Sequence, residues 1–153
     1  TEICPWRKKL LCGEVHDDNA YAMGGVAGHA GLFSSARDVH ALLARLSQCL
    51  LGKDKFLPQS LLREFLSRDD ASKAGNFVLG WDTPSPAKSA SGILFSPRSV
   101  GHLGFTGCSI WWDLEKNCHV VLLTNRVHPS RKNEKIKEFR PQVHDLIMKA
   151  LFP

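Results

Sequence analysis

The stretch Gly101-His102-Leu103-Gly104-Phe105-Thr106-Gly107 leads directly into two runs that decide the fold: Cys108-Ser109-Ile110-Trp111-Trp112 and His119-Val120-Val121-Leu122-Leu123-Thr124. Both runs are rich in β-branched and aromatic residues, which is typical of strands. The polar residues 113–117 between them are typical of a turn. We therefore expect an antiparallel hairpin, preceded by a glycine-spaced strand whose missing side chains let another chain or a substrate lie against the backbone.

Three segments outside the hairpin have helical periodicity. Residues 35–51 repeat Val39, Leu42, Leu43, Leu46 and Leu50 at helical spacing, begin with a capping-box-like Ser35 and Asp38, and stop at Gly52. A shorter helix is expected to begin with Pro58 at its first position and to bury Leu61, Leu62, Phe65 and Leu66. A third covers residues 133–151, with Pro141 kinking or restarting it.

The remaining chain is mostly irregular. Residues 1–33 contain glycine clusters and no sustained period, which predicts a long loop that is ordered and close to a site. Within the polar segment 67–97, residues 77–81 are interpreted as a strand or extended segment. Trp111 and Trp112 alternate along their strand, so we expect one in the core and the other exposed or at an interface. The order of elements predicts an α+β fold, with helices over a small antiparallel sheet. Three strands are few for a self-standing sheet, which is the first indication of a missing half.

Composition excludes several classes of protein. The 153 residues are 43% hydrophobic, which suits one soluble domain or part of one, and no apolar run is long enough for a membrane span. The net charge of +5 comes with basic residues around 126–140 that lack interleaved aromatic residues, so we expect a solvated helix face and no nucleic-acid partner. The chain opens at Thr1 without an initiator Met or an apolar signal core, so we expect a preceding segment and assign no compartment.

Cysteine and histidine patterns do not predict a metal centre. The five cysteines are odd in number and lack C-x-x-C spacing, which favours free thiols. If Asp113 and Cys118 close the hairpin loop, Cys108 falls opposite Leu123, so no cross-strand disulfide joins the two cysteines. The polar residues His16, Asp17, Asp18 and His29 could be imagined as metal ligands, but hydrogen bonding within an ordered loop explains them better. We expect no metal and no cofactor.

The glycine-spaced stretch 101–107 resembles the G-H-T-G-F-T-G form of the third motif of β-lactamase-related serine hydrolases, the superfamily that includes penicillin-binding proteins and family VIII-type esterases. Other members carry K-T-G there. Three further stretches are similar to the same family and follow its order, namely residues 13–20, 24–38 and 122–129. Without the resemblance, a tight strand with a packed histidine would explain the motif equally well.

The resemblance implies a helical region beside an antiparallel sheet covered by helices, with the active site between them. Its S-x-x-K nucleophile and Y-x-N tyrosine would lie upstream of residue 1. His102 would take the role of the motif's lysine, and the backbone N–H of Phe105 would be an oxyanion-hole donor. Gly104 would keep that edge open, and Thr106, His29 and Arg126 would line the substrate site. Arg126 is alternatively a loop anchor.

Two residues depart from the family's pattern. Leu103 replaces the usual Thr or Ser, which removes a hydroxyl that would bind a substrate carboxylate, and Cys108 stands where a small hydroxyl residue is common. Penicillin is therefore a less favoured substrate than an ester or a peptide-like compound. The literal S-x-x-K match at Ser85-Pro86-Ala87-Lys88 lies in a stretch of loop character instead of a helix start, and Tyr21 has no Y-x-N context.

We accordingly interpret residues 1–153 as the C-terminal part of one β-lactamase-related domain, whose N-terminal part completes the site. The whole would be a serine hydrolase acting through an acyl-enzyme on a small ester, amide or peptide-like substrate, as a carboxylesterase, a D-amino-acid peptidase or a β-lactamase. The chain alone is expected to be inactive. The alternative is a non-catalytic, penicillin-binding-protein-like binding or regulatory module, and Leu103 is the residue that favours it.

Overall fold

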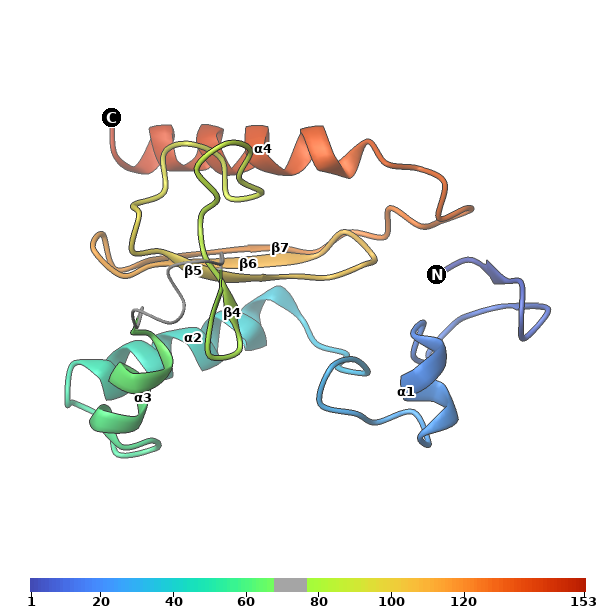
Figure 1. Ribbon diagram of the computed structural model, residues 1–153, viewed down its shortest axis with the longest axis horizontal. Coiled ribbons are helices and arrows are strands. Elements are labelled where there is room, and N and C mark those ends of the chain that lie inside the picture. The colour runs from blue at the N-terminus through green and yellow to red at the C-terminus, as the bar shows by residue number, and fades with distance from the viewer. Residues whose placement is uncertain (68–76) are drawn as a thin grey trace.

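An antiparallel sheet lies between two layers of helices in the computed structural model, which describes residues 1–67 and 77–153 (Figure 1). Within these residues the sheet has the order β3-β4-β5-β6-β7. The strands are β3 (Phe77–Val78), β4 (Trp81–Asp82), β5 (Val100–Leu103), β6 (Ser109–Asp113) and β7 (Cys118–Leu122). The α+β fold and the antiparallel sheet expected from the sequence are confirmed.

The hairpin of β6 and β7 has the expected register. Asp113 pairs with Cys118, and Ser109 pairs with Leu122. The Asp113 carboxylate accepts hydrogen bonds from the backbone N–H groups of Glu115 and Lys116, which stabilises the connecting turn. The thiol of Cys108 lies 3.3 Å from the carbonyl oxygen of Thr124, and all five cysteines are free.

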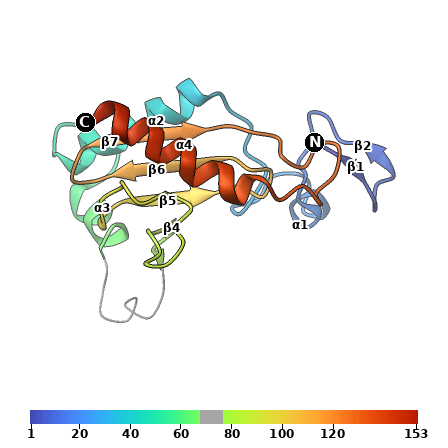
Figure 2. The same ribbon diagram turned by 90° about the horizontal axis from the view of Figure 1, so that it is seen from above.

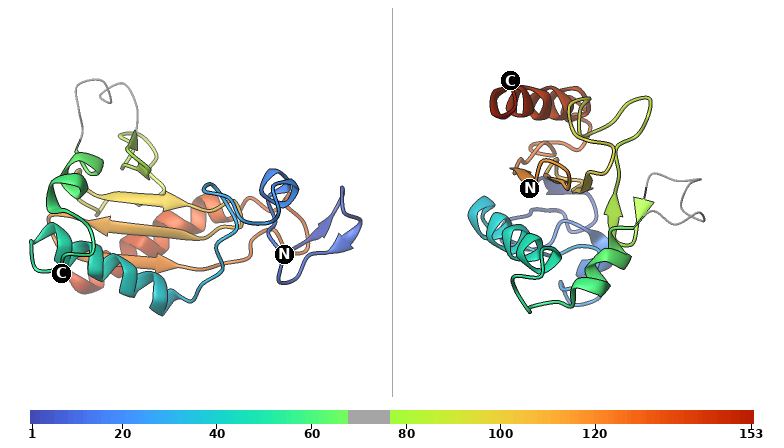
Figure 3. Two further views of the ribbon diagram at one scale, coloured as in Figure 1. Left: turned by 90° about the horizontal axis from the view of Figure 1, so that it is seen from below. Right: turned by 90° about the vertical axis from the view of Figure 1, so that its left-hand side faces the viewer.

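The helices cover both faces of the sheet. Helix α2 (Ala36–Leu50) and helix α3 (Gln59–Phe65) lie on one face, and α4 (Ile136–Leu151) crosses the other (Figure 3). The Ser35 hydroxyl caps α2 by accepting from the N–H of Asp38 at 3.1 Å, so the predicted helix start is confirmed. The prediction for α3 was wrong in detail, because Pro58 is its N-cap. Of the four apolar residues, Leu62 is buried, Leu66 is partly buried, and Leu61 and Phe65 are exposed.

The expectation that one of the two tryptophans would be exposed was wrong, since each has only 1% of its surface exposed. Because helices cover both faces, alternation along β6 sends Trp112 into one core and Trp111 into another. The α2-side core comprises Leu46, Cys49, Leu62, Val78, Val100 and Trp112. The α4-side core comprises Phe95, Trp111, Val120 and Met148.

Other boundaries also differ from the sequence prediction. Residues 77–81 do not form one strand, because the chain turns at Gly80 (φ 77°) and makes the β3–β4 hairpin, which gives the sheet five strands instead of three. Residues 68–76 of the predicted polar segment lie outside the described residues. Helix α4 begins at Ile136 instead of Asn133 and runs through Pro141. Its buried residues are Arg140, His144 and Met148.

The N-terminal segment, residues 1–33, is placed at one end of the sheet, beside the chain that connects β7 to α4 (Figure 2). It contains a small hairpin of β1 (Ile3–Cys4) and β2 (Lys9–Leu10), followed by the short helix α1 (Asp18–Ala22). The Asp17 carboxylate caps α1 by accepting from the N–H of Ala20 at 2.8 Å. The expectation of a loop throughout was therefore wrong for these elements. Among the described residues, no helix has the length and apolar character needed to cross a membrane.

Candidate active site

The turn after β5 presents a backbone N–H group that is available to a ligand. The N–H of Gly104 donates to Cys108 O at 2.8 Å, and the N–H of Gly107 donates to Gly104 O at 2.9 Å. Gly107 has a φ of 101°, which favours glycine. The N–H groups of Phe105 and Thr106, in the middle of the turn, have no hydrogen-bond partner in the described parts of the chain. The family resemblance of residues 101–107 implies that the Phe105 N–H is an oxyanion donor.

His102 is exposed on β5, two residues before the turn begins. Alternation places it on the same face as Val100, whereas Gly101 and Leu103 belong to the opposite face. Within residues 1–67 and 77–153, its imidazole makes no hydrogen bond. On the neighbouring strand, burial raises the pKa of Asp82, while the charges of His102 and Arg140 oppose that rise. His102 is thus free to contact a substrate or a nucleophile brought to this face.

Leu103 and Gly101 have packing roles on the face opposite His102. Leu103 is half-buried against the α4-side core. A Cβ atom on Gly101 would lie 2.5 Å from the Trp111 ring, so no side chain fits there. Gly104 is less confined, since a Cβ would lie 3.3 Å from that of Cys108.

Arg126 and Thr106 meet Phe105 at the turn. The Arg126 guanidinium donates to Phe105 O at 2.8 Å and lies 4.4 Å from the centroid of the Phe105 ring. Its Nη1 also donates to the carbonyl oxygens of Arg131 and Asn133. The carbonyl of Thr106 accepts from the Arg126 N–H at 2.8 Å. Arg126 therefore has the loop-anchor role that the sequence left open, and its contact with substrate stays a prediction.

His29 lies in the glycine-rich loop, away from these hydrogen bonds. Its Nε2 is 3.0 Å from the carboxylate of Asp17. The pKa of Asp17 is lowered, first by the hydrogen bond from the Ala20 N–H and then by His29. No hydrogen bond in the described residues joins His29 or His102 to the Phe105 turn. Among the predicted site residues, the structure thus brings together Gly104, Phe105, Thr106 and Arg126.

Three residues beside the turn were missed as site residues by sequence reasoning. Glu2 is only 3% exposed, and its carboxylate lies 2.9 Å from His16 Nε2 and 2.7 Å from Arg131 Nε. Burial opposes ionisation of Glu2, but the hydrogen bonds from Arg131 and His16 outweigh it and lower its pKa to about 2. The His16 ring in turn stacks on Phe105, with centroids 5.5 Å apart. The 129 residues that separate Glu2 from Arg131 explain why no local pattern indicated this pair.

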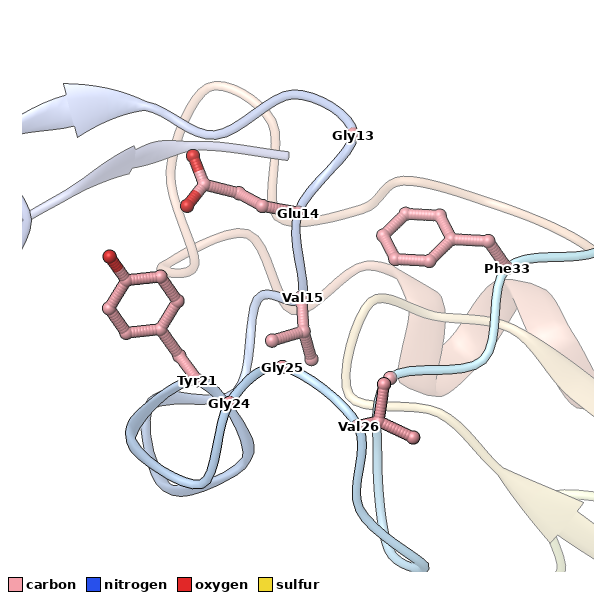
Figure 4. A pocket seen from close by; sticks show the side chains of 9 residues that line it. Gly13, Glu14, Val15, Tyr21, Gly24, Gly25, Val26 and Phe33 are labelled. Atoms are coloured by element: carbon pink, nitrogen blue, oxygen red, sulfur yellow. The ribbon is translucent and has the colours of Figure 1, made fainter.

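A cavity of about 580 Å³ opens beside the N-terminal hairpin and the glycine-rich loop (Figure 4). Glu14, Val15, Tyr21, Val26 and Phe33 line it, together with glycines at positions 13, 24, 25 and 31. A Cβ on Gly31 would lie 2.7 Å from Gly25 O, so the two passes of the loop approach closely only because this residue is glycine. All residues that line the cavity belong to the segment 1–33, which the sequence predicted to be close to a site.

The two alternative sites considered from sequence are also located. The Ser85-Pro86-Ala87-Lys88 stretch lies in irregular chain between β4 and β5, without the helix start that an S-x-x-K nucleophile needs. His16 contacts Glu2, His29 contacts Asp17, and Asp18 accepts from Arg7. The part of the chain that the structure describes contains no group of three or more potential metal ligands.

Comparison with known proteins identifies the family. The beta-lactamase family model matches residues 6–144. Proteins of Salmonella agona, Salmonella paratyphi B and Salmonella newport, each named "Putative D-alanyl-D-alanine carboxypeptidase", are 36% identical to this chain over 134 residues. The aligned part is 85% of this chain and 31% of each relative, so the chain spans about a third of their length. No solved structure matches. Since the family match covers most of the chain, this protein belongs to the beta-lactamase family of serine hydrolase-type proteins.

Proposed function

We propose that this chain forms one wall of the active site of a serine hydrolase, and that the Phe105 turn is its oxyanion-binding element. The observation that carries the proposal is that the Phe105 N–H has no hydrogen-bond partner among the described residues, in a turn whose Gly104 and Gly107 N–H groups are both bonded. A donor fixed in this way can stabilise the negative charge that develops on a carbonyl oxygen when a nucleophile attacks it. The exposed His102, on the adjoining strand, would take part in the accompanying proton transfer.

The edge of β5 supports an extended, peptide-like substrate. Strand β4 pairs with β5 only between Asp82 and Gly101. Beyond Gly101 that edge of β5 has no strand neighbour among the described residues, so a substrate backbone could lie along it. The name of the Salmonella relatives favours a peptide that ends in D-alanyl-D-alanine. Esters and other amides are the remaining candidates in the same chemical class.

The serine nucleophile, in this proposal, comes from an N-terminal part of the same domain. It would carry the S-x-x-K and Y-x-N motifs, attack the substrate carbonyl, release the alcohol or amine, and pass the acyl group to water. The chain covers only about a third of its relatives, which leaves room for such a part. Val26, Leu32 and Phe33 are exposed apolar residues of the N-terminal segment, and a covering domain would remove them from water.

The second candidate, a non-catalytic binding module, is favoured by one observation. Position 103 is Leu, so it lacks the hydroxyl that the resemblance associates with substrate binding. Its side chain packs against the α4-side core. A module of this kind would keep the turn and the β5 edge but would not form an acyl-enzyme. The two candidates therefore differ in whether the complete protein reacts covalently.

The test uses this chain alone and a chimera in which it replaces the aligned region of the Salmonella agona relative. Both are incubated with a fluorophosphonate probe and, separately, with a penicillin, and then weighed intact and mapped. We expect the chain alone to stay unmodified and the chimera to gain one phosphonyl group at a serine outside residues 1–153. An adduct on Ser85 of the chain would contradict the divided site. A folded chimera without an adduct would favour the binding module.

A further inference from the structure

The side chain of Phe105 is 57% exposed, yet it is held on its turn by basic and aromatic groups from distant parts of the chain. The His16 ring stacks on it with planes 20° apart, and the Arg126 guanidinium lies over it at 4.4 Å. A guanidinium stacked over an aromatic ring is attracted by the electrons of the ring face. Contacts from two separate segments therefore restrict a residue that a turn alone would leave mobile.

Four residues are linked by contacts that begin and end at Phe105. Arg126 holds the Phe105 carbonyl and ring, and it donates to the carbonyl of Arg131 at 2.7 Å. Arg131 donates to the buried carboxylate of Glu2 through both its Nε and its backbone N–H. Glu2 holds His16, which stacks back on Phe105. Arg126, Arg131, Glu2 and His16 are called the Phe105 clamp below.

The clamp acts on the peptide groups that flank the free donor. The Arg126 guanidinium binds the carbonyl oxygen of Phe105, which fixes the peptide group after the Phe105 N–H, and the backbone N–H of Arg126 binds the carbonyl oxygen of Thr106. The carbonyl of Gly104 shares a peptide plane with that N–H and accepts from Gly107. Because the peptide group is planar and trans, the Phe105 N–H points away from the Gly107 bond, out of the turn. Loss of the clamp would release the Phe105 ring and the peptide group that follows it, so the turn that carries the Phe105 N–H could shift.

We propose that Arg126 and His16 are positioning residues that aim the Phe105 N–H at the developing oxyanion, with Glu2 and Arg131 holding them in place. The inference rests on the proposed function, because it assigns a purpose to the same N–H group. Neither side chain needs to touch the substrate. An oxyanion donor must lie about 2.7–3.1 Å from the charged oxygen. A small rotation of the turn therefore reduces stabilisation of the transition state more than it reduces substrate binding.

The experiment measures kcat and KM for hydrolysis of a p-nitrophenyl ester by the chimera and its variants. We expect His16→Ala and Arg126→Gln to lower kcat about 10- to 100-fold, below the roughly 100- to 1000-fold that follows complete loss of a donor, with KM changed less than about twofold. His16→Phe keeps the stacked ring without the bond to Glu2 and should recover most of the loss. The matched control is Arg45→Gln, because Arg45 also stacks on a phenylalanine, Phe56 at 4.3 Å, and pairs with Asp54. We expect its kcat to stay within about twofold.

The outcomes separate this inference from the proposed function. If the chimera reacts but its His16 and Arg126 variants match Arg45→Gln, the clamp inference is overturned and the proposed function stands. A rise in KM at constant kcat would overturn it too, because Arg126 would then bind substrate directly. Should Arg126→Gln fail to fold, the His16→Ala and His16→Phe pair decides. If the unsubstituted chimera takes no probe, the proposed function fails, and the NMR signal of the Phe105 amide in this chain decides the clamp: it must shift in His16→Ala and not in Arg45→Gln.

Discussion

The sheet with its helices and the N-terminal segment are held by different forces. In the sheet region, two apolar cores on opposite faces enclose Trp111 and Trp112. In the N-terminal segment, the buried groups include Glu2, and Arg7 donates to the carbonyls of Val15 and His16 with only 5% of its side chain exposed. The stabilisation from apolar burial is insensitive to pH and grows with the area buried. The strength of charged hydrogen bonds depends on pH and on salt.

This contrast locates the candidate site at the junction of the two regions. The Phe105 turn extends from the apolar sheet, but the residues that hold it belong to the polar segment and to the loop before α4. The turn is therefore joined to an apolar core on one side and to charged hydrogen bonds on the other.

The largest effect is expected from removing a core tryptophan. Trp111→Ala and Trp112→Ala should each lower the free energy of unfolding by about 3–5 kcal/mol, because each leaves a cavity in a core. Urea denaturation followed by circular dichroism measures this. Trp6→Ala is the control, since Trp6 is 56% exposed and should cost less than about 1 kcal/mol. A mild effect at Trp111 would mean that α4 does not cover that face.

The next effect comes from adding a methyl group to the glycine-spaced strand. Gly101→Ala should destabilise by about 1–3 kcal/mol, because its Cβ would lie 2.5 Å from the Trp111 ring and 2.6 Å from Ile110 O. Gly28→Ala adds the same methyl group where nothing lies within 4 Å, so it should be close to neutral. Thermal unfolding of both variants gives the comparison. Equal effects at the two positions would contradict the close packing of β5 on β6.

A similar or smaller loss of stability should follow from lowering the pH. Glu2 has a pKa lowered to about 2 in the folded protein, so it binds a proton more weakly there than when unfolded, where its pKa is 4.5. Its contribution to stability is therefore present above about pH 4.5 and is lost as the pH falls toward 2. We expect a loss on the order of 2–3 kcal/mol across this range. Glu2→Gln should remove this part of the pH dependence, and Glu134→Gln, at an exposed ion pair, should not.

The sequence predicted those parts of the fold that depend on local periodicity. The β6–β7 register, helix α2 and its Ser35 cap follow from periods of 2 and 3.6 and from one capping residue. The burial of both tryptophans was missed, because alternation assigns opposite faces without saying that α4 covers the second. In α4, the buried positions include Arg140 and His144, whose polar groups bond to Cys108 O and Ala90 O, so apolar spacing does not indicate them.

The candidate site was predictable only in its backbone part. The resemblance to the family's third motif implied an oxyanion donor at the Phe105 N–H, and the structure leaves that N–H without a partner in the described residues. The side chains that hold the turn were not predictable, because Glu2 and Arg131 meet across 129 residues and His16 reaches Phe105 from another segment. Long-range ion pairs have no sequence period, so only the folded chain reveals them.

The smallest effect expected is a difference in salt response between the two regions. In 1 M KCl, amide hydrogen exchange of β1 and β2 should speed up about two- to fivefold, because screening weakens the Lys9 and Arg131 ion pairs that anchor the segment. Exchange in β6 and β7 should stay unchanged or slow slightly, since salt does not weaken apolar burial. Mass spectrometry of deuterated peptides measures both regions in one sample, so each serves as the other's control. Parallel changes in the two regions would show that the segment opens only when the sheet does, and the clamp would then be as rigid as the core it adjoins.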